Sequence, residues 1–378
     1  MQKFEKHSPV VVTEVTTKHE LRQFMQYPNR LYADNPNYIP SFYGDDLSDW
    51  TPGKNPAFDY CEARCWLARR DGEIVGRIGA ILSHKANDKF GTHRMRFSQV
   101  DFVDDSEVSA ALFGTVERWA REKGCDQVHG PLGFTDMDRE GMLVEGFDRR
   151  SLFFTNYNAP YYLEHLTRLG YRKDVDWIEY RITVPEPGGA EAERLHKLSE
   201  FILKRKHLHV ATVHHKSEYG PFVRQVFELV NAAYAPLYGV VELSDEQIER
   251  YANKFIPLVD PDFVCFVVDE QDQLVAFGVT ALDPSVALKH SDGRLFPFGW
   301  AGVLNDLHHS DTLIMLLTAV RPDLQTEGIN AVMMDHVCQS CNRHGVHFAE
   351  TGPMLELNDH ILAQWKRLEK EQHKRRRC

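Results

Sequence analysis

The amino-acid sequence contains the same layout of segments twice, once in each half of the chain. CWLARRDGEIVGRIGAI starts at Cys65 and CFVVDEQDQLVAFGVTAL starts at Cys265, and both reach a second apolar run, at Ile74 and Leu274, after the same number of residues. Two short apolar runs around a polar turn are typical of a β-hairpin. Each hairpin is followed by a third strand, a helix that ends at glycine, another strand and a Gly-Pro pair. The residues that mark these ends are Gly124, Gly130 and Pro131 in the first copy, and Gly345, Gly352 and Pro353 in the second. This order of elements predicts a duplicated unit.

The duplication sets the expected fold class and the number of domains. It predicts an α/β (α+β) protein of two units, each a mostly antiparallel mixed sheet flanked by helices, with one crossover helix per unit. The chain has 378 residues, more than one hydrophobic core usually serves. The segment PEPGGA at 185–190 has the composition of a linker. We therefore predict an N-terminal domain at 1–187 and a C-terminal domain at 188–378.

Composition narrows the function classes. An apolar content of 43 % with 26 % charged residues predicts a globular protein, and no apolar run is long enough to span a bilayer. No apolar segment follows the start MQKFEKHSPV, and the seven cysteines fit free thiols, so we expect a cytoplasmic protein without a membrane partner. The net charge of −11 argues against nucleic-acid binding. The terminal HKRRRC is interpreted as a solvated helix end.

Periodicity and capping residues predict the remaining elements. Thr17 with Glu20, and Ser244 with Gln247, form capping-box patterns that mark helix starts. The predicted strands are 10–15, 64–70, 74–82, 96–103, 126–129, 177–184, 208–213, 263–268, 274–281, 312–320 and 346–350. The predicted helices are 18–27, 108–120, 157–169, 191–206, 222–234, 244–255, 328–344 and 357–372. Irregular connections are expected at 28–58, 130–147 and 283–311.

The stretch TLIMLLTAVRPDLQTEGIN, residues 312–330, carries the strongest functional signal. It predicts a strand, a proline turn and a helix start. Such a junction directs unpaired backbone N–H groups and the positive end of the helix dipole to one place, which suits a phosphate-bearing ligand. Gly328 lets the backbone approach a pyrophosphate closely. The alternative is that Gln325 to Gly328 only begin a surface helix after a proline turn.

The order of elements resembles the GNAT superfamily of acyl-CoA-dependent N-acyltransferases, here in tandem. That family places a Q/R-x-x-G-x-G/A motif at the start of the helix after its fourth strand, and this sequence has QTEGIN at 325–330. Gly328 matches the first glycine, whereas Asn330 stands where glycine or alanine is usual. Asn358 in HFAETGPMLELND falls where many members carry an asparagine that holds the cofactor arm.

The resemblance implies a cofactor site in the second copy. In the family the fourth and fifth strands splay apart, and the pantetheine arm of the cofactor pairs with the freed edge. The implied cofactor is acetyl-CoA or another acyl-CoA, used as a substrate, without a metal. The implied cofactor-binding residues are Leu317, Thr318, Ala319, Val320, Gln325, Glu327, Gly328, Ile329, Asn330 and Asn358.

The two copies differ at the corresponding loop. In the first copy, carboxylates crowd the helix start, where they cap the helix and repel a pyrophosphate. These residues are Asp101, Asp104, Asp105 and Glu107. We therefore expect the first copy to be degenerate and the second to be the candidate acyl-CoA site. The second copy is also partly acidic, with Asp323 and Glu327 beside the basic Arg321.

Catalysis of amine acylation requires a base that removes a proton from the amine. Glu350, at the end of a strand facing the expected splay, is the first candidate, and Glu356 is the second. The alternatives are a strand-end carboxylate for Glu350 and a dipole-stabilising role at a helix start for Glu356. Many family members use a tyrosine of the last helix as acid for the leaving thiolate. HILAQWKRLEKE has Trp365 and no tyrosine, so another residue must fill that role.

No metal-binding motif stands out in the sequence. Cys338 and Cys341 form a C-x-x-C pair inside a predicted helix, which we interpret as one buried and one surface cysteine. The leading hypothesis is an acyl-CoA-dependent N-acyltransferase whose amine acceptor, a small molecule or a peptide, binds near the domain interface. Alternatives are an aminoacyl-tRNA-dependent transferase, against which the net charge argues, and a non-catalytic binding protein with this fold.

Overall fold

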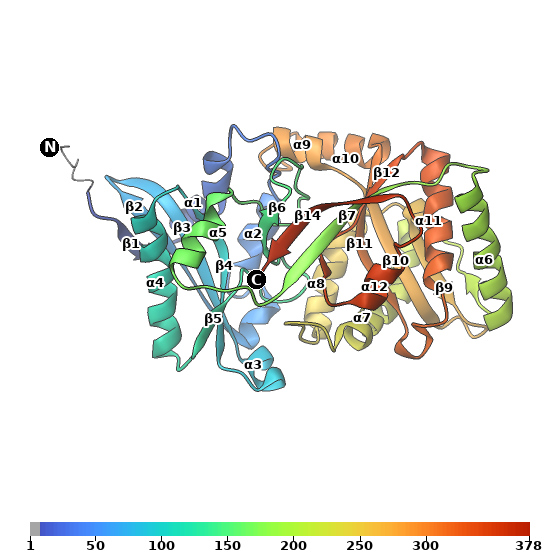
Figure 1. Cartoon of the computed structure of the whole chain (residues 1–378), viewed down its shortest axis with the longest axis horizontal. Helices are drawn as coiled ribbons and strands as arrows, with labels where there is room; N and C mark the ends of the chain where they lie inside the picture. Colours follow the sequence, from blue (N-terminus) through green and yellow to red (C-terminus); the bar gives the residue numbers. More distant parts are fainter. Residues whose placement is uncertain (1–7) are drawn as a thin grey trace. The chain divides into compact units, whose positions relative to one another are not determined.

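The computed structural model describes residues 8–378 and divides into two compact units (Figure 1). The first unit runs to Asp176 and includes residues 291–294 and 376–378. The second comprises residues 177–290 and 295–375. Residues 1–7, most of the segment used to argue against a leader, lie outside the described residues. None of the helices in the described part of the chain is long and apolar enough to cross a membrane.

The first unit is built on a sheet of order β1-β2-β3-β4-β5. Its strands are β1 (Val11–Glu14), β2 (Cys61–Arg70), β3 (Glu73–Ser83), β4 (Arg94–Phe102) and β5 (Gln127–His129). Neighbouring strands are antiparallel except β4 and β5, which are parallel. The helices are α1 (Lys18–Leu31), α2 (Tyr43–Asp49), α3 (His84–Phe90), α4 (Ser106–Glu122) and α5 (Tyr161–Arg168), with a 3-10 turn at Pro56–Asp59.

Alternation along β2 explains how this sheet acquires two cores. Trp66 packs on the face that α4 covers, and the next residue, Leu67, packs on the face that α1 covers. The turn between β2 and β3 is Asp71-Gly72, and both residues have a positive φ, as the predicted hairpin requires. The predicted capping box of Thr17 and Glu20 opens α1.

The second unit contains a sheet of order β14-β7-β12-β11-β10-β9-β8, with β13 also beside β7. The strands are β7 (Asp176–Thr183), β8 (His209–Val210), β9 (Val264–Val268), β10 (Leu274–Leu282), β11 (Thr312–Val320), β12 (Phe348–Glu350), β13 (Met354–Leu355) and β14 (Lys370–Arg377). A further strand, β6 (Met142–Glu145), is the outer neighbour of β14, whose last residues count with the first unit.

Seven helices accompany this second sheet. They are α6 (Ala190–Lys206), α7 (Gly220–Tyr234), α8 (Asp245–Phe255), α9 (Ser285–His290), α10 (Gly299–His309), α11 (Asn330–His344) and α12 (Asp359–Ala363). Single 3-10 turns lie at Lys216–Tyr219, Ile256–Leu258, Pro261–Phe263 and Pro322–Leu324. The helices α6 and α11 pack together on one face, where they bury Cys265 and Val267 of β9. Phe266 points to the opposite face and stacks on Phe222 of α7, with ring centroids 4.4 Å apart.

The predicted repeat is confirmed as a repeated topology. Strands β1 to β5 and β8 to β12 have the same order, and in both series only the last pair is parallel. Cys65 lies on β2 and Cys265 on the corresponding strand β9. β7, which the sequence places at the end of the first half, belongs to the second unit because it pairs with β12 and β13.

The predicted helix at 357–372 is wrong. Only Asp359–Ala363 is α-helical, and Lys370–Arg377 forms strand β14. The basic run is therefore not a solvated helix end, because Lys374 and Arg376 are 1 % and 0 % exposed. Lys374 is buried against carboxylates, and Arg376 donates a hydrogen bond to the carbonyl of Asn156. Strand β14 closes the sheet beside β7, a position for which the sequence analysis found no strand.

The predicted irregular connections contain regular elements. The segment 28–58 includes the end of α1, which continues through Pro28, and also α2. Strand β6 lies within 130–147, and α9 and α10 lie within 283–311. These helices are short or contain proline and glycine, so their patterns resemble those of loops.

Candidate functional site

Strands β11 and β12 form a fork in the second unit. They pair in parallel through Thr312, Leu313 and Ile314 only, opposite Phe348, Ala349 and Glu350. Beyond Ile314, β11 continues to Val320 and pairs with β10 alone. The expected splay is therefore present, and the segment 315–320 leaves one edge of β11 unpaired.

The backbone groups at this open edge follow from the strand register. The N–H of Arg321 donates to the carbonyl of Val275 on β10 (2.8 Å), so by alternation the N–H groups of Thr318 and Val320 point away from β10. The Thr318 carbonyl accepts a hydrogen bond from the Tyr234 hydroxyl (2.8 Å). The N–H groups of Thr318 and Val320 therefore face the fork, where an extended amide-bearing chain would find donors.

A β-bulge lies close to the fork. Leu317 is opposite Val279 and Met315 is opposite Thr280, so Leu316 is the extra residue in β11. An extra residue is left out of the regular ladder and bends its strand. The bulge lies within two residues of the last pair between β11 and β12.

An apolar cavity of about 90 Å³ occupies the fork on the face covered by α11. It is lined mainly by aliphatic, methionine and cysteine side chains of β7, β11, α6, α11 and the segment after α12. Representative lining residues are Ile182, Leu195, Met315, Leu317, Met333 and Leu368. Gln364 also lines it, and its Nε2 is buried without a hydrogen-bond partner among the described residues. This polar group suits an amide carbonyl of a bound chain.

The loop 325–330 follows the open end of β11 and leads into α11. Gly328 has φ +78°, and a Cβ there would meet Ile202 of α6 at 3.2 Å, so a side chain would be strained and crowded. α11 starts at Asn330 without a side-chain cap. Within residues 8–378, the N–H groups of Gly328 and Ile329 donate no hydrogen bond, which leaves them available to an anion.

The acidic residues of this loop are neutralised by neighbouring cations. Lys206, at the C-terminal end of α6, lies 2.6 Å from the carboxylate of Glu327 and lowers its pKa. Arg321 donates to Asp323 (2.8 Å) and lowers the pKa of that carboxyl. Lys206 could not be assigned to this loop from the sequence, because only the packing of α6 on α11 brings it there. The basic run at 204–206 was the only signal for it.

Glu350 lies at the branch point and belongs to a buried ionic cluster. Its carboxylate is 3.1 Å from Lys374 Nζ and 3.8 Å from His373 Nε2, and its side chain is 12 % exposed. Lys374 also lies 3.4 Å from Glu179, and both of those side chains are 0 % exposed. Sequence reasoning identified Glu350 but missed Lys374, because the wrongly predicted helix placed that lysine in solvent.

The other candidates lie as follows. Glu356 accepts from Arg375 (3.0 Å), and Asn358 caps α12 by accepting from the N–H of Ile361 (3.3 Å). Trp365 is buried and lines the cavity. Gln325 donates to the carbonyl of Val320 (3.4 Å). The candidate residues Leu317, Thr318 and Asn330 line the cavity, whereas Ala319, Val320 and Ile329 are buried beside it.

The C-x-x-C pair is also part of the cavity wall. Cys338 and Cys341 are 8 % and 1 % exposed, so the prediction of one surface cysteine is wrong. Burial raises the pKa of Cys338 to about 11 and that of Cys341 to about 12. Both thiols therefore stay protonated at neutral pH and contribute apolar surface to the cavity.

The corresponding helix start in the first unit is already capped. Asp105 accepts from the N–H groups of Glu107 (2.8 Å) and Val108 (3.4 Å) at the beginning of α4, as predicted. Arg70 binds both Asp105 (2.5 Å) and Glu107 (2.7 Å) and lowers the pKa of Asp105. In the first unit, the backbone N–H groups at this helix start are therefore bonded to Asp105. The N–H groups of Gly328 and Ile329, at the corresponding place in the second unit, have no such bond among the described residues.

Comparison with solved structures identifies the fold. The tandem GNAT protein from the clavulanic acid biosynthesis pathway, solved without AcCoA, aligns with a TM-score of 0.54 over 97 % of both chains at 14 % identity. The chain therefore has two domains with the fold of the GNAT superfamily, and the resemblance stated from the sequence is confirmed at the level of fold.

Two proteins are similar in sequence over most of the chain. Protein YghO of Escherichia coli (strain K12) is 27 % identical over 373 residues, which cover 97 % of this chain and 94 % of that protein. A bacterial ceramide synthase of Caulobacter vibrioides (strain NA1000 / CB15N) is 28 % identical over 300 residues, 78 % of this chain and 75 % of that protein. No protein-family profile matches the chain.

Proposed function

We propose that the second unit is an acyl-CoA-dependent N-acyltransferase. The observation that supports this most directly is the fork between β11 and β12, with an apolar cavity inside it and a glycine loop at its open end. The N–H groups of Thr318 and Val320 would pair with the amides of the pantetheine arm. The loop at 325–330, with Lys206 beside it, would hold the pyrophosphate.

The two faces of the fork suggest where each substrate enters. Ala349 lines the cavity, so the side chain of the next residue, Glu350, points to the opposite face of the sheet. Arg181 lies opposite Glu350 on β7 and shares that face. The pantetheine arm would lie on the face of α11, and the amine would approach the thioester from the face of Glu350.

The proposed reaction is a direct transfer. The amine nitrogen attacks the thioester carbonyl, the new C–N bond replaces the C–S bond, and Glu350 takes the proton that the nitrogen loses. The leaving thiolate takes up a proton, and the Tyr234 hydroxyl at the open edge is our candidate donor. The N–H of Leu316 in the bulge would stabilise the oxyanion formed on the carbonyl.

The first unit would not bind a second cofactor. The internal capping of α4 by Asp105 and its ion pair with Arg70 support this proposal, since a pyrophosphate would have to displace both. This agrees with the expectation that the first copy is degenerate.

The acceptor is proposed to be the primary amine of a long-chain amphiphile. The similar Caulobacter protein is named a ceramide synthase, and a ceramide is a long-chain amino alcohol acylated on its nitrogen. The chemistry of such a step is the N-acylation described above. Incubation with palmitoyl-CoA and a panel of amines, including a sphingoid base, spermidine and a lysine peptide, tests the acceptor class by mass spectrometry. Acylation of the polyamine or peptide alone would exclude the amphiphile and keep the transferase.

We expect acyl-CoA to raise the thermal midpoint of the protein. At a concentration of 100 Kd a ligand stabilises the folded state by about 2.7 kcal/mol, which corresponds to about 5–10 °C for a unit of this size. Lys206→Ala should raise the Kd about tenfold or more, because it removes a charged hydrogen-bond donor beside the phosphates. Differential scanning fluorimetry with acetyl-CoA and palmitoyl-CoA measures both effects.

Lys197→Ala is the matched control for this variant. Lys197 lies on the same helix and also pairs with a glutamate, Glu193 at 3.3 Å, but it lies more than two turns before Lys206. Equal losses of affinity in the two variants would contradict a phosphate site at the loop. No midpoint shift with any acyl-CoA at millimolar concentration would contradict the proposed function itself.

A further inference from the structure

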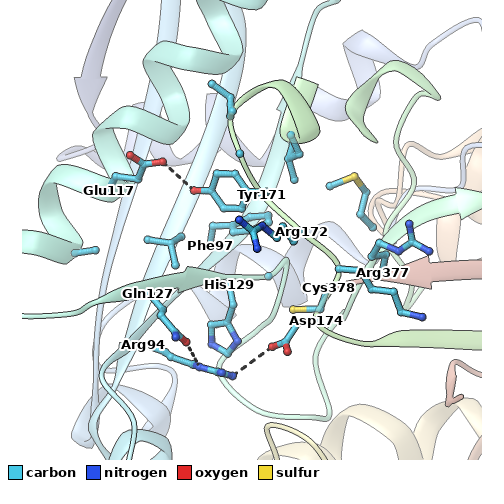
Figure 2. Close-up of a pocket in the computed structure, with 18 of the residues that line it drawn as sticks. Arg94, Phe97, Glu117, Gln127, His129, Tyr171, Arg172, Asp174, Arg377 and Cys378 are labelled. Atoms are coloured by element: carbon cyan, nitrogen blue, oxygen red, sulfur yellow. Dashed lines mark hydrogen bonds and ion pairs between the residues drawn. The ribbon is translucent and has the colours of Figure 1, made fainter. Parts of the chain in front are cut away.

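The first unit contains a cavity of about 810 Å³ (Figure 2). It is larger than the cavity of about 90 Å³ in the fork of the second unit. It lies beside β4 and β5, which pair only through Arg94–Arg96 and Gln127–His129. Phe97 and Tyr171 contribute apolar wall, while charged side chains reach it from the segment after α5 and from the last residues of the sequence. Neither the proposed reaction nor the cofactor loop of the second unit uses this cavity.

Three possible metal ligands meet in this cavity. His129 ends β5, Asp174 lies in the segment before β7, and Cys378 is the last residue of the sequence. One ring nitrogen, one carboxylate oxygen and the sulfur all lie within 4.8 Å of one another. Figure 2 shows the imidazole, the carboxylate and the sulfur turned toward a common point.

We propose that His129, Asp174 and Cys378 form a binding site for a divalent transition-metal ion, with Zn²⁺ as the best match. Zn²⁺ accepts nitrogen, oxygen and sulfur ligands at about 2.0–2.3 Å, so ligand atoms around one ion lie about 3.3–4 Å apart. The observed spacing of up to 4.8 Å requires the three side chains to close by about 1 Å around the ion.

The backbone around the three ligands is fixed by hydrogen bonds. The N–H of Asp174 donates to the carbonyl of Cys378 (2.8 Å), and the N–H of Cys378 donates to the carbonyl of Val175 (2.8 Å). This pairing holds the cysteine beside the aspartate. His129 is held by the register of β5 against Arg96 on β4. A metal ion would therefore restrict only the three side chains, because the backbone is already held in place. This limits the entropic cost of metal binding.

The charges around the cluster are mixed, because Arg94, Arg172, Lys173 and Arg377 line the same cavity as Asp174. Arg94 donates to Asp174 Oδ2 (3.3 Å) and through Nε to Gln127 (2.7 Å), so a hydrogen bond from behind orients the carboxylate. Arg377 is bound to both oxygens of Asp176, at 2.8 and 2.9 Å. The aspartate and the cysteine thiolate supply two negative charges to a divalent ion. Binding releases the thiol proton to solvent.

Three protein ligands leave one position of a tetrahedral ion for water or an exchangeable ligand. The cavity of about 810 Å³ beside the cluster has room for such a ligand. Sequence reasoning expected no metal, because the three residues lie far apart in the chain and form no spacing motif. Only the fold brings them together.

Titration of the full-length protein with Co²⁺ tests the site, since Co²⁺ occupies zinc sites and gives a thiolate-to-metal absorption band. We expect one equivalent to produce the band in the wild type, and Zn²⁺ to displace it. Cys378→Ser should abolish the band. Loss of a residue that only hydrogen-bonds to a metal ligand weakens metal binding by about 10- to 100-fold. Asp174→Asn, which alters a ligand itself, should weaken Co²⁺ binding by more than this. Circular dichroism and thermal melts of each variant confirm folding.

Cys125→Ser is the matched control, because Cys125 lines the same cavity but does not belong to the cluster. It should retain the band with the affinity of the wild type. Absence of the band in the wild type, or its persistence in Cys378→Ser, would overturn the proposed site. If Cys378→Ser does not fold, the Asp174→Asn variant decides the question. An unchanged Co²⁺ affinity of that variant would also overturn the proposed site. The acyl-CoA thermal shift is independent of all these outcomes, so the two proposals fail separately.

Discussion

Glu350→Gln is expected to lower kcat for acyl transfer by about 10²–10⁴-fold, the usual contribution of a general base. The substitution keeps the shape of the side chain and removes its ability to take a proton. Because Glu350 is on the face opposite the cavity, the acyl-CoA midpoint shift should remain within about 1 °C of the wild-type value, a small fraction of the binding effect. Single-turnover measurement of amide formation, with saturating acyl-CoA and amine, checks the rate.

Glu356→Gln provides the control for this experiment. Glu356 is a partly exposed glutamate that pairs with Arg375 at 3.0 Å, and it is the second candidate base. Near wild-type kcat in Glu356→Gln, together with a large loss in Glu350→Gln, would assign the base to Glu350. A Glu350→Gln enzyme with unchanged kcat would rule out the proposed base and favour a substrate-assisted transfer. Absence of amide formation in the wild type would favour a binding protein.

The sequence predicts local features well where one pattern dominates. The limits of strand 312–320 agree with β11, because nine residues without a charge lie between Asp311 and the Arg321-Pro322 turn. Both capping boxes are present, since each depends on two side chains three residues apart. The unpaired edge at 317–320 was inferred from the resemblance, and the register of β11 with β10 and β12 supplies it.

The same reasoning fails where distant contacts override local preference. KRLEKEQHKRRR has the composition of an exposed helix, and its second half is a strand because β7 offers a free edge and buried carboxylates. For the same reason Lys206, Gln364 and Lys374 could not be assigned to the site from the sequence. Each of these three residues reaches the site from an element whose position in the fold cannot be predicted from the residues next to it in the sequence.

Asn358 illustrates the opposite outcome, in which a local role accounts for a residue that the resemblance assigned to the cofactor. Its side-chain oxygen caps α12 through the N–H of Ile361, and its amide is not part of the cavity wall. Its assignment to the cofactor remains a prediction. For Asn358 to bind the cofactor, one of two conditions must hold. Either the side-chain oxygen gives up its hydrogen bond to the N–H of Ile361, or the side-chain NH₂ group binds the cofactor while the oxygen keeps that bond.

Lys374→Met is expected to lower the free energy of unfolding by about 3–5 kcal/mol, the typical cost of removing one partner from a buried ion pair. Lys374 Nζ lies between Glu179 (3.4 Å) and Glu350 (3.1 Å), and no part of the Lys374 or Glu179 side chain is exposed. Without the ammonium group, two carboxylates face each other in a site of low polarity. Urea unfolding monitored by tryptophan fluorescence measures the loss.

Arg375→Met is the matched control, since Arg375 is the next residue and pairs with Glu356 at 3.0 Å, but the side chains of Arg375 and Glu356 are 22 % and 23 % exposed. That pair should contribute about 1 kcal/mol or less. The double variant Glu179→Met/Lys374→Met should recover part of the stability, because it leaves one carboxylate, that of Glu350, where Lys374→Met alone leaves two. A Lys374→Met protein as stable as Arg375→Met, or a double variant no better than the single, would mean that the ionic cluster does not hold β14 to the sheet. Since Glu350 belongs to the same cluster, that result would also require another account of what positions the proposed base.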